Sequence, residues 1–242
     1  MDKKLTEIFY QLRFPVLLIV ILWITEFYET FSGNDLYRWG IYPREWDSLV
    51  GVITAPLIHS DFEHLISNTV PLFTLTSVMI FFYRKVALPS YIVIQLFTGF
   101  AVWIFARPSY HIGASGVVYG LVSFVFWSGV FRRNIKSIVL ALIIVVMYSG
   151  YFYGILPNKE GVSWESHLFG GIVGIFTAFL FKNIQEEDEK EVVYSWELEE
   201  EEGGYFLPRD IFEKTKEQRR IEAEIKRRQE MWGDNWTSDN TF

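Results

Sequence analysis

Two stretches decide the architecture of this chain: HIGASGVVYGLVSFVFWSGVF at 111–131 and SHLFGGIVGIFTAFLF at 166–181. Each opens with polar residues and continues as an apolar run. Crossing about 30 Å of hydrocarbon takes roughly 20 apolar residues in a helix, which both runs approach. Glycines recur in both at four-residue spacing, and small residues let membrane helices pack closely. The sequence therefore predicts membrane helices that pack tightly and keep polar groups at one end.

Four further stretches resemble these two. Half of all residues are hydrophobic and 18% are aromatic, which is too apolar for an ordinary soluble domain of this size. The six candidate spans are 14–30, 64–82, 87–106, 115–131, 135–154 and 166–181. Several are short and carry polar residues, which favours a compact bundle over independent lipid-facing helices. The fold class predicted is an all-α polytopic membrane protein with a bundle of six transmembrane helices.

Charge divides the chain unevenly. Residues 1–182 carry 13 basic and 11 acidic residues, whereas residues 183–242 carry 9 and 18. We therefore expect a cytoplasmic N-terminus (1–13), a membrane domain (14–182), an acidic linker (183–208) and a charged C-terminal helix or tail (209–242) that is too polar for a seventh span. Nothing resembles a basic nucleic-acid surface, and the absence of cysteine excludes disulfides and thiolate chemistry.

Lysine and arginine placement predicts the orientation. One side of the proposed topology collects nine such residues: Lys3, Lys4, Arg13, Arg84, Lys85, Arg132, Arg133, Lys136 and Lys182. The other side collects four: Arg38, Arg44, Arg107 and Lys159. The positive side faces the cytoplasm. We expect both termini there, the loops 31–63, 107–114 and 155–165 outside, and a multi-pass protein of a bacterial inner membrane.

Ser115 is the first candidate for chemistry. It lies between Gly113 and Gly116 at the start of a span. A serine there can cap the helix or fill a packing site, and that reading is the commoner one. The free N–H groups of a helix start can also stabilise an oxyanion. A nucleophilic serine needs an adjacent base, usually histidine, and the chain has four histidines, all on the outer side of the topology.

His167 supplies a route to such a pair. Gly170 and Gly174 follow it on its own helical face, and Gly116 and Gly120 give the fourth span a comparable face. If these faces meet, the serine and the histidine come together at one depth.

The third member of a triad is not evident. Glu165 points to a different face of the helix from His167, which favours a dyad. Tyr119, one turn after Ser115, is expected to stack on the imidazole and orient it.

His64 and Asn68 lie four apart at the start of the second span, on one face of a helix. They either point into a common cavity or make two interhelical hydrogen bonds. A metal or transporter site built on His59, Glu63 and His64 is a further alternative. The i,i+5 spacing of these histidines does not place both on one face, so we predict no metal and no cofactor.

These residues resemble the rhomboid family of intramembrane proteases. The matching segments are GIYPREWDSLVGVITAPLIHSDFEHLISNTVPL (40–72), HIGASGVVYGL (111–121) and SHLFGGIVG (166–174), within a likeness that covers 14–182. The resemblance implies an intramembrane serine endopeptidase. Its substrates would be transmembrane helices of other proteins, cut near the outer face of the lipid bilayer.

The resemblance also implies roles for single residues. Ser115 would attack the scissile carbonyl and His167 would take and return its proton. His64, Asn68 and the Ser115 backbone N–H would stabilise the oxyanion, and Gly113 would shape the loop around it.

Two features depart from the family pattern. Arg38-Trp39 reverses the order of the family's Trp-Arg pair, which leaves the conformation of the 31–63 loop open. Independently of the family pattern, Glu26 is expected to anchor that loop by hydrogen bonding. The tail beyond 182 has no counterpart, and it either binds an unidentified cytoplasmic partner or acts as a solubilising end. An inactive relative that binds transmembrane clients without cutting them is the remaining alternative, although such a protein would be expected to lack the serine or the histidine.

Overall fold

The computed structural model describes residues 3–157, 162–184, 186 and 212–236. The chain divides into two units, 1–190 and 191–242. Helices dominate the described residues, and the one β contact among them is an isolated bridge between Ile41 and His111. The all-α fold class is confirmed.

The first unit is a bundle of membrane-type helices. Its long helices are α1 (Lys3–Ser32), α3 (Phe62–Phe82), α4 (Ala87–Phe105), α5 (Ser115–Arg132), α6 (Ile135–Tyr148) and α7 (Trp164–Leu180). Each begins and ends within a few residues of the limits of a predicted span, with two exceptions. The helix of the first span begins well before it, at Lys3, and the fifth span leaves the α-helix at Tyr148 and continues as the 3₁₀ helix η4 (Ser149–Ile155).

Four of the described helices are long and apolar enough to cross a membrane, namely α1 from Thr6 onward, α3, α4 and α5. The helices α6 and α7 have 14 and 17 residues and are apolar but shorter. The chain is therefore an integral membrane protein, while the count of six crossings remains a prediction. At 1.5 Å per residue, α7 is about 25 Å long, close to the lower limit for a span.

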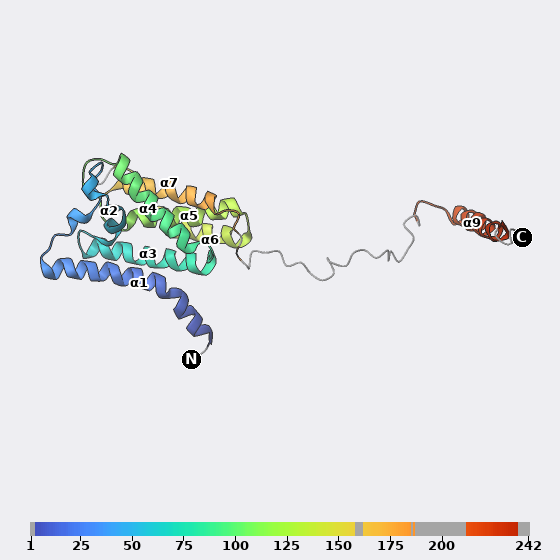
Figure 1. Ribbon diagram of the computed structural model, residues 1–242, viewed down its shortest axis with the longest axis horizontal. Coiled ribbons are helices and arrows are strands. Elements are labelled where there is room, and N and C mark those ends of the chain that lie inside the picture. The colour runs from blue at the N-terminus through green and yellow to red at the C-terminus, as the bar shows by residue number, and fades with distance from the viewer. Residues whose placement is uncertain (1–2, 158–161, 185, 187–211, 237–242) are drawn as a thin grey trace, which may run out of the picture. The chain divides into compact units, whose positions relative to one another are not determined.

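The helix α5 occupies the centre of the bundle. It contacts α3, α4, α6 and α7, and its contact with α7 is the most extensive. Figure 1 shows α1 lying along α3 at one edge, with α5 in the interior. The core consists of aliphatic and aromatic side chains from all six long helices, among them Leu65, Leu75, Ile94, Leu121 and Phe124.

The 31–63 segment folds as a chain of short helices: η1 (Tyr37–Trp39), η2 (Trp46–Ser48), α2 (Gly51–Thr54) and η3 (Ala55–Leu57). The loop is anchored by Glu29, whose Oε1 accepts the Leu36 N–H at 3.1 Å. The expectation for Glu26 was wrong in this respect. Glu26 lies about one turn earlier on α1, is only 5% exposed, and its buried Oε2 has no hydrogen-bond partner among the residues that the structure describes.

The second unit contributes the described helix α9 (Lys216–Trp236), which lies within the range 209–242 predicted as a charged C-terminal helix or tail. Most of the predicted acidic linker lies outside the described residues. Glu186, near its start, belongs to the first unit, where its carboxylate accepts the Lys85 N–H at 3.1 and 3.2 Å.

Candidate active site

Glycines bring α5 and α7 into backbone contact. A Cβ on Gly170 would collide with the carbonyl oxygen of Gly116, and a Cβ on Gly174 would collide with that of Gly120. A Cβ on Gly116 would lie 3.1 Å from the Ser166 carbonyl. The two predicted glycine faces therefore meet, and only glycine lets the helices approach this closely.

The approach joins Ser115 and His167. Ser115 Oγ lies 2.8 Å from His167 Nε2, although 52 residues separate them in sequence. His167 is 7% exposed. The serine hydroxyl and the imidazole are thus in direct contact, which is the geometry that a nucleophile and its base require.

The His167 ring is held on its other side by a backbone carbonyl. His167 Nδ1 lies 2.8 Å from Gly154 O in η4, and a carbonyl can only accept, so Nδ1 carries the proton. His167 Nε2 is then the acceptor for the Ser115 hydroxyl. Gly154 was missed because nothing in the sequence of 149–155 indicates that its carbonyl turns toward α7.

Tyr119 stacks on the imidazole as predicted. Its ring centroid lies 4.1 Å from that of His167 with 8° between the planes, and its hydroxyl donates to Tyr151 O at 2.7 Å. A Cβ on Gly154 would collide with the Tyr119 hydroxyl, so that turn also needs glycine. Glu165 pairs instead with Arg107, at 3.5 Å.

Ser115 is not the cap of its helix. Ala114 holds the N-cap position, and Ser115 is the first residue of α5. Its backbone N–H is one of the first few of the helix, which lack an intrahelical acceptor. This N–H therefore points out of the helix end beside the Ser115 hydroxyl.

His64 and Asn68 flank the same loop from α3. A Cβ on Gly113 would lie 2.7 Å from His64 Nε2 and 3.8 Å from Asn68 Nδ2. Gly113 has φ of 97°, a left-handed conformation that glycine adopts without strain, and its N–H donates to Ala55 O at 2.9 Å. Both side chains thus lie beside the Gly113 loop, and the Asn68 amide donates to the His64 carbonyl within α3 at 3.1 Å.

The His64 backbone and the Nδ1 side of its ring are held by Asp61 and Ser60. Asp61 caps α3 by accepting the His64 N–H at 2.8 Å, and it also accepts the Ser60 hydroxyl at 2.7 Å. Ser60 Oγ therefore accepts from His64 Nδ1, at 3.3 Å. The hydrogen bond from the His64 backbone holds the pKa of Asp61 below its ordinary range, so this carboxyl is ionised.

His59 packs edge-on against His64, with ring centroids 5.0 Å apart. It is 2% exposed, and burial lowers its pKa from 6.5 to about 4, so its ring is neutral. Within the described part of the chain, no group of three His, Asp or Glu side chains is placed to hold a metal ion.

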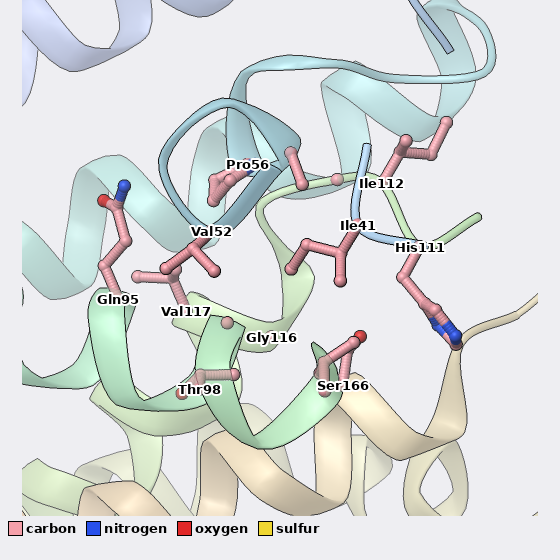
Figure 2. A pocket seen from close by; sticks show the side chains of 14 residues that line it. Ile41, Val52, Pro56, Gln95, Thr98, His111, Ile112, Gly116, Val117 and Ser166 are labelled. Carbon is pink, nitrogen blue, oxygen red and sulfur yellow. The ribbon is translucent and has the colours of Figure 1, made fainter. Parts of the chain in front are cut away.

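A small cavity lies beside the Gly113–Gly116 segment. It is lined mainly by residues of α4 and the loop before α5, with others from α2, η3 and the start of α5, and with Ser166 from α7. In Figure 2, Thr98 and Ser166 lie at the lower end of the cavity, and Ile41 and Ile112 lie above them in the view. Neither Ser115 nor His167 is among the residues that line it.

Comparisons with known proteins agree with this arrangement. Residues 46–184 match the family described as Rhomboid domain. An uncharacterized protein of Mycobacterium tuberculosis is 33% identical over 171 residues, which cover 67% of this chain and 71% of that protein. An uncharacterized protein of Mycobacterium leprae is 30% identical over 175 residues, which cover 67% of this chain and 68% of that protein. The family match contains Ser115, His167, His64 and Asn68.

Proposed function

Because the chain belongs to the rhomboid family, a family of intramembrane serine proteases, we propose that it is an endopeptidase that cuts transmembrane segments of other membrane proteins near their outer ends. Ser115 is the nucleophile and His167 is its general base. The observation that carries the proposal is the 2.8 Å contact between Ser115 Oγ and His167 Nε2, in the tautomer that leaves Nε2 free to take a proton.

The proposed reaction proceeds in two halves. Ser115 Oγ bonds to the scissile carbonyl carbon while its proton passes to His167 Nε2. The tetrahedral intermediate collapses as His167 returns the proton to the leaving amine, and an acyl-enzyme remains. His167 then takes a proton from water, which attacks the acyl carbon, and returns that proton to Ser115 Oγ as the new carboxyl end is released. Gly154 O stabilises the imidazolium that forms in each half, and Tyr119 holds its plane.

The oxyanion is proposed to lie between α3 and the start of α5. Donors for it are the Ser115 N–H, the Asn68 amide and His64 Nε2, all near Gly113. His64 donates from Nε2 only when that atom carries a proton. This occurs when the ring is doubly protonated, or when the Ser60 hydroxyl turns to donate to Nδ1.

A cut near the outer face follows from the orientation predicted by the Lys/Arg count. A test is available because the chain has no cysteine. Asp35→Cys in the first loop should react with a membrane-impermeant maleimide on intact bacterial cells, and Arg84→Cys should react only after lysis. The reverse pattern would invert the topology.

The enzyme itself is tested with a serine-directed fluorophosphonate and a model transmembrane substrate. Wild type should be labelled and should cleave. Ser115→Ala should lose both activities, because no nucleophile remains, and His167→Ala should lose at least about 10³-fold in rate.

A second serine on the same helix provides the matched control. Ser128 lies more than three turns from Ser115 and its buried hydroxyl has no hydrogen-bond partner among the described residues, so Ser128→Ala should still be labelled and active. Wild type that is neither labelled nor active on several substrates would favour the inactive, client-binding alternative.

A further inference from the structure

His111 has no role in the proposed chemistry, yet its ring is buried and hydrogen-bonded on both nitrogens at the end of the bundle that holds Ser115 and His167. It is 2% exposed. Its backbone pairs with Ile41 of the first loop in both directions, at 2.8 and 3.0 Å. Ser115 follows only four positions later in the chain, so His111 belongs to the short loop that leads into α5.

The partners of the His111 ring fix which of its nitrogens donates a hydrogen bond and which accepts one. His111 Nε2 lies 3.1 Å from Arg107 O, which can only accept, so Nε2 carries a proton. Burial lowers the pKa of His111, which keeps the ring neutral and leaves Nδ1 as an acceptor. The Ser163 hydroxyl, 2.6 Å away, therefore donates to Nδ1.

Ser163 connects this ring to α7. It is the N-cap of that helix: its Oγ accepts the Ser166 N–H at 3.3 Å and lies 2.6 Å from Ser166 Oγ. Since the Ser163 proton is given to His111, the Ser166 hydroxyl donates to Ser163. The Ser163 carbonyl accepts the His167 N–H at 3.4 Å. His111 thus reaches the base through one intervening residue, and Figure 2 shows its ring directed toward the start of α7.

We propose that His111 is a positioning residue for the dyad. Through the Ser163 hydroxyl it fixes where α7 begins relative to α5, and so it sets the separation of His167 and Ser115. Arg107 braces the same junction by donating to Val162 O at 3.0 Å. The inference rests on the proposed function, because positioning has meaning only if the dyad is catalytic.

The test compares His111→Ala, Ser163→Ala and the double variant in the full chain. Each single variant should lower kcat and the rate of fluorophosphonate labelling by roughly 10- to 100-fold with little change in KM, as expected for a misplaced catalytic group. The double variant should lose no more than the worse single variant, because both act through one link. Ser163→Thr keeps a hydroxyl and a capping side chain, and it should restore most of the rate.

The control is the N-cap residue of another helix, which is not linked to His111. Asn134 caps α6 by accepting the Ser137 N–H at 2.8 Å, and Asn134→Ala should lower the melting temperature while the labelling rate of folded protein stays at the wild-type value. A purely structural role for His111 would give the same result. The chain has four histidines, so ¹⁵N-histidine NMR can also show whether the His111 ring is the neutral Nε2–H tautomer and whether both single variants shift the His167 ring signals.

Two outcomes overturn the inference for different reasons. Active wild type, with His111→Ala and Ser163→Ala labelled at the same rate, removes the positioning role and leaves the protease intact. Wild type as inactive as Ser115→Ala removes the proposed function, and the inference with it.

Discussion

Two helix contacts in this bundle are built by opposite means. Between α5 and α7, backbone meets backbone: glycines face carbonyl oxygens, and hydrogen bonds cross from Ser115 to His167 and from Ser123 to Gly171. Between α1 and α3 the contact is made by large rings, with Trp23 and Phe27 packed on Phe62 at 5.6–6.3 Å. In the most apolar window of each helix, 56% of α5 is buried but only 11% of α1.

The difference matters for chemistry. A contact between backbones has no flexible atoms to absorb an error, so a small change in side-chain volume displaces a whole helix. A contact between rings can repack around a substitution. Ser115 and His167 lie on opposite sides of this rigid contact. This explains how the hydrogen bond between them can be kept at 2.8 Å without a carboxylate as the third member of a triad.

Gly170→Ala is the strongest way to break the α5–α7 contact. The added methyl would collide with Gly116 O, so the helices must separate, at a cost of about 1–3 kcal/mol in stability. Turnover should fall by roughly 100-fold. Gly171→Ala is the matched control, because nothing lies within 4 Å of a Cβ there. Melting temperature and cleavage rate that are equal in the two variants would contradict the rigid contact.

The buried His59 ring, just before α3, should make stability depend on pH. Both α1 and α5 pack on this helix. Its pKa of about 4 lies below the ordinary 6.5, so the unfolded chain binds a proton first as the pH falls. The stability from the neutral ring is complete above about pH 6.5 and is lost toward pH 4, by about 3 kcal/mol at most.

The measurement is the free energy of unfolding in detergent as a function of pH. His59→Phe keeps a ring against His64 but cannot titrate, so its stability should fall less steeply between pH 6.5 and 4. Curves that are parallel for wild type and variant would show that His59 is not the group responsible.

Trp23→Phe should have the smallest effect. It removes the indole donor to Thr69 Oγ1, at 3.2 Å, and keeps an aromatic ring in the α1–α3 contact. The expected loss is about 1 kcal/mol or less of stability. The cleavage rate of the folded protein should not change, since this contact does not touch the dyad. A tenfold loss of rate would mean that α1 also positions the site.

Much of the site was accessible from local pattern. The apolar runs predicted most of the helix ends to within a few residues. Polar groups are costly in hydrocarbon, so membrane helices are recognisable from their apolar composition. The spacing of Gly116, Gly120, Gly170 and Gly174 predicted the close contact, and the position of Tyr119 predicted the stacking. In contrast, the anchoring role assigned to Glu26 falls to Glu29, because which acid reaches the loop depends on the path of the loop after α1.

What the sequence determined by itself is therefore what depends on periodicity and transfer into lipid: helix positions, the glycine faces, and a serine and a histidine at the ends of two of these helices. Only the tertiary structure decided which groups complete the pocket. The Gly154 carbonyl on His167, Ser60 on His64 and Ser163 on His111 are contacts made by turns and loops. Their direction is set by where distant helices place the chain ends, and no residue type or spacing encodes that direction locally.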